Sequence, residues 1–268
     1  MFIAPGSVGM IGNPNAPSKG GGATWTPLDL YQPGDILLWY DPSDLSTLFQ
    51  DTAGTTPVTA DGQSAALIRD KGPGGYHRTQ SLGPNMPKYK TDGVLHRLLY
   101  DGTDDFYQTA SINWGTDEVA ACVGLTKASN AAAGVVFEFG ITINNGTFGL
   151  FAPALTSGEF QFNSRGTVGV APRSGVFSAP VTKVLTTMGK ISTDAAILRV
   201  DGAQVATAAG DQGTGNFGNN IMNSGRRQTG GIPLNGSEYQ TVIRNRLFSA
   251  DEIAQIESFI AAEAGLTL

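Results

Sequence analysis

The sequence predicts an all-β protein in which two antiparallel sheets pack face to face as a jelly-roll sandwich with one shared interior, plus an extended N-terminal arm and one C-terminal helix. Three observations predict this class. Charged residues make up only 15% of the 268 residues, while 36 glycines and 14 prolines supply many turns. Short apolar runs lie between those turns, and one stretch near the C-terminus has helical periodicity. We therefore expect about ten to twelve short strands.

Several strands are predicted directly from apolar runs. Residues 36–40 form a continuous apolar run, and Pro42 then prevents its extension. Residues 135–141 alternate with a period of two, which predicts a strand with one face inside. Residues 148–151 and 160–162 supply two more short strands.

A hairpin and a long final strand are predicted in the second half of the chain. Asp201-Gly202 lies between the apolar runs 196–200 and 203–206. Asp-Gly favours a type I′ turn, because both central residues of that turn need positive φ. Residues 239–247 alternate and predict the last long strand.

The helix is predicted over residues 249–264. Ser249 is a good N-cap, and Glu252 stands at the position that completes a capping box. Gly265 can end the helix. One face carries an apolar stripe for packing, formed by Ile253, Ile256 and Ile260.

The chain divides into an arm, residues 1–24, and one sandwich domain, residues 25–268. The arm has six glycines and three prolines, with Lys19 as its only charged side chain. It is more apolar than a free linker, because it contains Phe2, Ile3, Val8, Met10 and Ile11. We expect an assembly arm that becomes ordered on a partner surface, and a loose or self-packed terminus is the alternative.

Composition excludes several partners. The net charge is −6 and no segment clusters Lys or Arg, so no nucleic-acid partner is expected. No apolar run approaches the roughly 20 residues that span a bilayer, so no membrane insertion is expected. Cys122 lies in an apolar run without a mate and is interpreted as a small buried hydrophobe, which suits assembly in a reducing cytosol.

An acidic turn is the best candidate for a metal site. Asp101, Asp104 and Asp105 place three carboxylates in five residues, and calcium prefers such oxygen ligands. The alternative is turn chemistry, in which Asp side chains accept hydrogen bonds from nearby backbone N–H groups. Turn chemistry is the favoured interpretation, so no cofactor is expected, and calcium at this turn is the one candidate.

Aromatic residues near loops are the candidates for binding a sugar ring. Trp25, Tyr76, Tyr107 and Trp114 lie near predicted loops, and we take Tyr76, Tyr107 and Trp114 as the candidate ligand-binding residues. Each of them can instead belong to the core.

Residues 213–218 match the pattern GxGxxG, but they do not follow a parallel strand and open a helix. We therefore interpret them as part of a surface loop rather than a dinucleotide site.

Three segments carry a family resemblance. Residues 98–107 read Leu-Leu-Tyr-Asp-Gly-Thr-Asp-Asp-Phe-Tyr, an apolar strand that enters an acidic turn and leaves it as an aromatic strand. Together with residues 36–44 and 245–253, this segment resembles the concanavalin A-like, laminin-G-like domains of bacteriophage virion proteins. The resemblance covers residues 35–268. It implies a concanavalin A-like jelly roll, a virion setting, and calcium at sheet-edge loops.

Some sandwiches of this kind are glycosidases, which need two carboxyl groups about 5 Å apart. None of the seven glutamates begins the Glu-x-Asp-x-x-Glu or Glu-x-Asp-x-Glu pattern of such enzymes, and neither His77 nor His96 has a ligand-spaced partner. We therefore predict no catalytic residues and no enzyme. Carboxylates from different strands can still converge, so hydrolysis stays a third possibility.

The resulting hypothesis is a non-enzymatic virion structural protein: a capsid-decoration, head-fibre or tail-associated subunit that displays the sandwich and is anchored by its arm. Its partners would be capsid or tail subunits and further copies of itself, on a particle assembled in the host cytoplasm. The alternative is a receptor module of a tail fibre that binds bacterial surface glycans.

Overall fold

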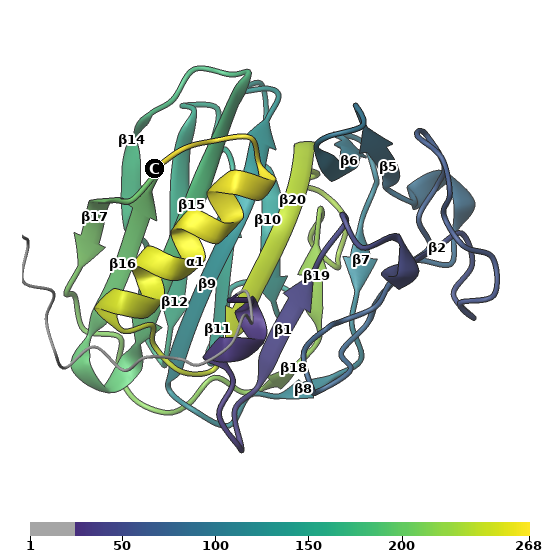
Figure 1. Cartoon of the computed structure of the whole chain (residues 1–268). Coiled ribbons are helices and arrows are strands. Elements are labelled where there is room, and N and C mark those ends of the chain that lie inside the picture. Colours follow the sequence, from purple (N-terminus) through teal and green to yellow (C-terminus); the bar gives the residue numbers. More distant parts are fainter. Residues whose placement is uncertain (1–24) are drawn as a thin grey trace, which may run out of the picture.

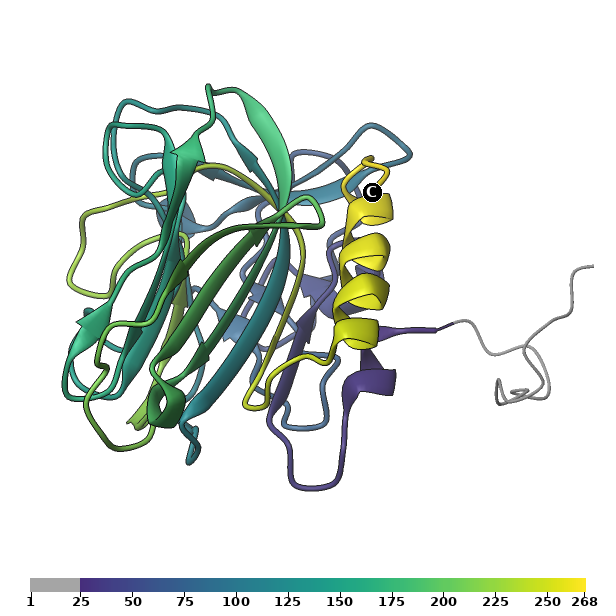
Figure 2. The same ribbon diagram turned by 90° about the vertical axis from the view of Figure 1, so that its left-hand side faces the viewer.

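The computed structural model describes residues 25–268, which form two large antiparallel sheets and one helix (Figure 1). Helix α1 (Ala250–Glu263) lies against the outer face of the first sheet, as the turned view in Figure 2 also shows. The predicted sandwich with a C-terminal helix is confirmed. The described residues contain twenty strands, more than expected, because many of them are only two residues long.

Sheet A has eight strands in the order β17-β16-β15-β9-β20-β6-β5, with β1 paired to β20 beyond the end of β6. Its strands are β17 (Ala203–Ala208), β16 (Ala195–Val200), β15 (Val181–Lys190), β9 (Glu118–Lys127), β20 (Asn235–Arg244), β6 (His96–Asp101), β5 (Lys88–Thr91) and β1 (Leu37–Tyr40). Strand β20 occupies 235–244 rather than the predicted 239–247, because it begins opposite Asp101 of β6 and ends opposite Leu37 of β1.

Sheet B has ten strands in the order β13-β12-β11-β10-β19-β7-β4-β3-β2, with β14 also paired to β12. Its strands are β13 (Gly169–Val170), β12 (Glu159–Arg165), β11 (Thr147–Phe151), β10 (Val135–Phe139), β19 (Met222–Ser224), β7 (Tyr107–Gln108), β4 (Arg78–Thr79), β3 (Leu67–Ile68), β2 (Leu48–Phe49) and β14 (Arg173–Val176). The remaining elements are the small sheet β8 (Ile112–Asn113) and β18 (Asn219–Asn220), and the 3-10 helices η1 (Pro27–Leu30), η2 (Leu45–Thr47), η3 (Gly83–Asn85) and η4 (Ile191–Thr193).

Two local predictions are confirmed in detail. The β16–β17 hairpin turns at Asp201 (φ 46°) and Gly202 (φ 81°), both with the positive φ that a type I′ turn requires. At the start of α1, Ser249 Oγ accepts a hydrogen bond from the Glu252 N–H at 3.2 Å, and Glu252 Oε2 accepts one from the Ser249 N–H at 2.7 Å. Gly265, at φ 71°, follows the helix. Within residues 25–268 no helix is long and apolar enough to cross a membrane.

The interior is divided into two layers, so the expectation of a single interior was wrong. The larger apolar cluster lies between the sheets, and a second lies between sheet A and α1. Trp39 and Cys122 belong to the second cluster, where the Trp39 ring contacts Phe259 of the helix edge to face. Sheet A needs both clusters because its central strands present apolar side chains on each face.

Strand β10 also differs from its prediction. All five of its residues are buried, whereas one buried face was expected, and Ile141 lies outside the strand and is exposed. The unexpected burial concerns Glu138, whose carboxylate is covered by Arg227 at 2.7 Å. An ion pair thus satisfies a charge that the alternating pattern placed in water.

A second ion pair lies inside the sandwich. Arg78 of β4 and Glu238 of β20 are fully buried and meet at 2.5 Å, which links sheet B to sheet A. The Tyr100 hydroxyl donates to Glu238 at 3.0 Å, and the Arg78 guanidinium lies 3.8 Å from the centre of the Tyr40 ring. The core therefore joins the two sheets through charge as well as through apolar contact.

The arm residues Phe2, Ile3, Val8, Met10 and Ile11 lie outside the described residues, and so does the predicted boundary at residue 24. The docking arm stays a prediction.

Replacing Arg78 with Met should lower the free energy of unfolding by about 3–5 kcal/mol, because it leaves the Glu238 carboxylate buried without its partner. The double variant R78M/E238L should recover most of that loss. Breaking the exposed Arg173–Glu159 pair with Arg173→Met should cost under about 1 kcal/mol. Urea unfolding measures all three, and a single Arg78 variant as stable as the double variant would contradict the assignment.

Candidate functional site

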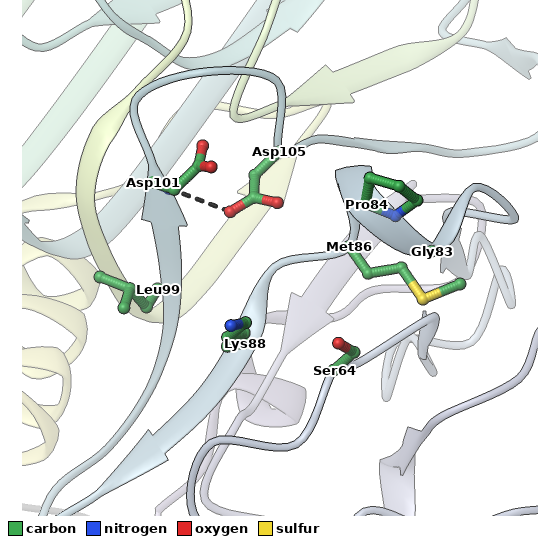
Figure 3. A pocket seen from close by; sticks show the side chains of 8 residues that line it. All are labelled: Ser64, Gly83, Pro84, Met86, Lys88, Leu99, Asp101 and Asp105. Carbon is green, nitrogen blue, oxygen red and sulfur yellow. Dashed lines mark hydrogen bonds between the residues drawn. The ribbon is translucent and has the colours of Figure 1, made fainter.

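A hollow of about 390 Å³ lies at the edge of sheet A, beside the acidic turn (Figure 3). Its walls come from β5, β6, the short helix η3 and neighbouring loops, so that charged, hydroxyl and apolar groups face one opening. The lining residues are Ser64, Gly83, Pro84, Met86, Lys88, Leu99, Asp101 and Asp105.

The acidic turn is built by its own carboxylates. Asp101 ends β6, and its Oδ1 accepts hydrogen bonds from the backbone N–H groups of Thr103 at 2.7 Å and Asp104 at 3.3 Å. Asp105 Oδ2 in turn accepts the N–H of Asp101 at 2.9 Å, which is the bond drawn in Figure 3. These three bonds close the loop and fix the direction of both carboxylates at the rim of the hollow.

The electrostatics of the turn are unusual at Asp105, which is 6% exposed. The pKa of Asp105 is raised to about 6, chiefly by burial and also by the negative charges of Asp101 and Asp104, while the Asp101 N–H and the Lys88 ammonium oppose the shift. One carboxyl group of the turn therefore titrates just below neutral pH.

The structure brings the three predicted metal ligands together. One carboxylate oxygen each from Asp101, Asp104 and Asp105 can be chosen so that all three lie within 4.8 Å of one another. Two of these carboxylates already accept backbone hydrogen bonds, so the turn chemistry that was the alternative is present. Calcium takes six to eight oxygen ligands, and calcium at this turn stays a prediction.

Two of the three candidate sugar-binding aromatics are wrong, because their rings are in the core. Tyr107 is 0% exposed and donates its hydroxyl to the Ala65 carbonyl at 2.6 Å. Trp114 is 1% exposed, donates its indole N–H to the Glu118 carbonyl, and packs its ring 4.9 Å from that of Phe148. A polar atom on each ring finds a partner inside the protein, so neither ring needs solvent.

Tyr76 is half-buried and packs against the core between the sheets, and its carbonyl accepts the Tyr40 hydroxyl at 2.6 Å. It does not line the hollow. The residues that sequence reasoning missed are Met86, Lys88 and Ser64, which line the opening from β5 and two loops. The isolated bridge between Ser64 and Lys88 joins residues 24 positions apart, and no local pattern signals it.

The two histidines hydrogen-bond to other groups of the protein, and the cysteine is buried. The His77 ring accepts the N–H of Asp70 through Nδ1 at 3.0 Å, and His96 pairs with the Tyr89 hydroxyl at 2.5 Å. Cys122 is fully buried, and burial raises the pKa of its thiol well above its usual value.

No protein-family model matches this sequence, and no protein with a curated description does. Among solved structures, the chain is similar to the receptor-binding domain of botulinum neurotoxin type G, with a TM-score of 0.54 and 7% identity over 75% of this chain and 52% of that one. It is also similar to the Trypanosoma rangeli sialidase solved with a difluoro-KDN ligand, with a TM-score of 0.52 and 11% identity over 75% of this chain and 33% of that one. The chain thus spans about half of the first structure and a third of the second. At these identities the comparisons show the lectin-like β-sandwich fold.

Asp105→Asn should remove a pH-dependent loss of stability. The pKa of Asp105 is higher in the folded protein, about 6, than the ordinary value of 3.8, so its contribution to stability is complete below about pH 4 and is lost as the pH rises through 6. The variant keeps an acceptor for the Asp101 N–H and should be more stable than the parent at pH 8, by about 3 kcal/mol at most. Denaturant unfolding between pH 4 and 8 tests this. Parallel pH profiles for variant and parent would contradict it.

Proposed function

We propose that the chain is a non-enzymatic virion subunit whose sandwich binds glycans through the hollow between β5, β6 and the acidic turn. This joins the two leading hypotheses from the sequence: a structural component of a bacteriophage particle, and a module for bacterial surface glycans. The arm, residues 1–24, is its proposed anchor to capsid or tail subunits.

The chemistry of the hollow is the main support. Sugar hydroxyls donate well to carboxylates, and Asp101 and Asp105 stand at the rim with fixed directions. The Lys88 ammonium supplies donors of the opposite charge, and Met86 and Leu99 offer apolar contact for the C–H face of a ring. A volume of about 390 Å³ lies within the range of pockets that bind small ligands.

The fold supports the same proposal. The botulinum domain to which this sandwich is similar is described as receptor-binding, and the sialidase was solved with a sugar derivative. The virion setting and the homo-oligomer on the particle rest on the resemblance of residues 36–44, 98–107 and 245–253 to phage laminin-G-like domains.

Hydrolysis is the second candidate, because one observation favours it: Asp105, with a pKa raised to about 6, lies beside Asp101. A glycosidase needs such a pair of carboxyl groups with different affinities for a proton. Here both belong to one tight turn and hold its backbone, which supports the non-enzymatic proposal. Release of reducing ends from bacterial polysaccharides by the purified chain would favour hydrolysis over the non-enzymatic proposal.

Glycan binding should depend on Asp101 and Lys88. Asp101→Asn keeps an acceptor for the turn but removes the charge, and Lys88→Gln removes the ammonium; each should weaken binding on an array of bacterial glycans about tenfold or more. Asp92→Asn is the matched control, because Asp92 also accepts two backbone N–H groups through one oxygen but lies outside the hollow. Lys90→Gln, two residues along β5, is the control for Lys88.

A flat array for the parent chain, or equal losses in the controls, would reject the hollow as the site. Repeating the array with calcium and with a chelator tests the calcium prediction. If the acidic turn binds calcium, chelation should lower both glycan binding and the melting temperature of the parent, and Asp104→Ala should abolish that dependence.

Removing residues 1–24 should lower incorporation of the subunit into particles while leaving the unfolding curve of residues 25–268 unchanged. The reason is that the arm carries apolar side chains, which a docking arm would bury on a partner subunit. Particle-bound subunit, measured by quantitative immunoblot after purification, is the readout. Undiminished incorporation would remove the arm as anchor.

A further inference from the structure

A second hollow, of about 530 Å³, lies at the opposite end of β9. It is lined by Asp117, Ile191, Ser192, Gly213, Thr214, Gly215 and Asn216. Asp117 immediately precedes β9. The first hollow lies near the other end of that strand, because Gly236 of β20 pairs both with Lys127, the last residue of β9, and with Tyr100 of β6, which lies between the lining residues of that hollow. Ten residues of strand separate the two places by about 30 Å.

The glycine-rich part of this hollow is held rigidly from both sides. Gln212 is 0% exposed: its side-chain N–H groups donate to the carbonyls of Lys190 and Ala195, and its Oε1 accepts the Ser164 hydroxyl at 2.6 Å. At the other side the Phe217 ring is buried in the core and contacts Phe148 edge to face.

Between these two anchors, residues 213–216 face the opening. The Thr214 N–H donates to Thr167 Oγ1 at 3.2 Å, and the Asn216 side-chain amide donates to the Gly115 carbonyl at 2.9 Å. The segment is therefore fixed before any ligand arrives, which is the condition under which a loop binds without a large ordering cost.

Several hydrogen-bonding groups in the opening are unused among the described residues. The backbone N–H groups of Gly215 and Asn216 and the Thr214 hydroxyl make no hydrogen bond there. Gly215 has φ +99°, and a Cβ added to it would meet nothing within 4 Å, so its peptide is open to a ligand. Asp117 adds an acceptor, since it is ionised at neutral pH: burial opposes its ionisation, but hydrogen bonds from Ser192 hold its pKa below the ordinary value.

These groups select one ligand class. The lining contains no Lys or Arg, and the Asp117 carboxylate repels anions, so phosphate and carboxylate ligands are disfavoured. One carboxylate is too few for a divalent cation. No strand and helix flank the glycines in the way that a dinucleotide requires. Neutral hydroxyl groups match, because each can donate to Asp117 and accept from a free N–H.

We propose that this hollow is a second binding site, for the neutral, hydroxyl-rich face of a hexose, in which Asp117 accepts from sugar hydroxyls while the N–H groups of Gly215 and Asn216 donate to sugar oxygens. The site is chemically distinct from the first hollow, whose lining combines a lysine with Asp101 and Asp105. It stands on its own observations and does not depend on the proposed function.

Titration of the ¹⁵N-labelled full chain with glucose, galactose, mannose and N-acetylglucosamine, each tested separately into the millimolar range, tests the proposal. At least one sugar should shift the amide signals of Ser192 and residues 213–216 in a saturable way. Asp117→Asn keeps an acceptor for the Ser192 N–H and should weaken this binding about tenfold or more. Thr214→Val keeps the shape, removes a hydroxyl that has no internal bond, and should weaken it severalfold.

Asp101→Asn, at the first hollow, is the control and should leave these shifts unchanged. The proposal is overturned if none of the four sugars moves these amides, or if Asp117→Asn and Thr214→Val titrate like the parent. If Asp101→Asn loses array binding but keeps these shifts, the two sites are separate. If Asp101→Asn keeps array binding as well as these shifts, all sugar binding belongs to this second hollow.

Discussion

The burial of the central strands of sheet A on both faces is the constraint on which the rest of the molecule depends. Its inner face packs against sheet B, and its outer face is covered by α1. With both faces used for packing, the two hollows occupy an edge and an end of the sheet, where strands give way to turns. The fold thus places stability in the buried strands and both hollows beside strand ends and loops.

The same constraint explains why charge enters the interior. The central strands of sheet A are covered on both sides and have no wet face, so Glu238 of β20 needs the buried partner Arg78. Glu138 lies on β10 of sheet B, is also buried, and pairs with the half-buried Arg227. The Arg78–Glu238 pair joins residues 160 positions apart, and Tyr100 adds a further bond to the same carboxylate. Such a pair stabilises little beyond what apolar residues would give, but it penalises any register that separates its partners.

What could be predicted from the sequence was local. The Asp201-Gly202 hairpin and the Ser249–Glu252 capping box depend on residues at most three positions apart, and both are present as expected. The acidic turn was also identified, because its carboxylates bond to their own backbone. The failures were long-range: Tyr107 lies near a turn in the sequence, yet its hydroxyl reaches the carbonyl of Ala65 in the core. Lys88 joined the candidate site only because β5 pairs with β6, which no single segment reveals.

The position of Cys122 has a practical consequence. It is the only cysteine in the chain, and it lies sealed between sheet A and α1, where the Thr186 hydroxyl donates to its sulfur. A thiol that stays protonated and out of contact with water neither couples to a neighbouring molecule nor responds to the change from a reducing to an oxidising medium. A cysteine introduced at a surface position would therefore be the only thiol that reacts with a fluorophore or a crosslinker, as long as the helix stays in place.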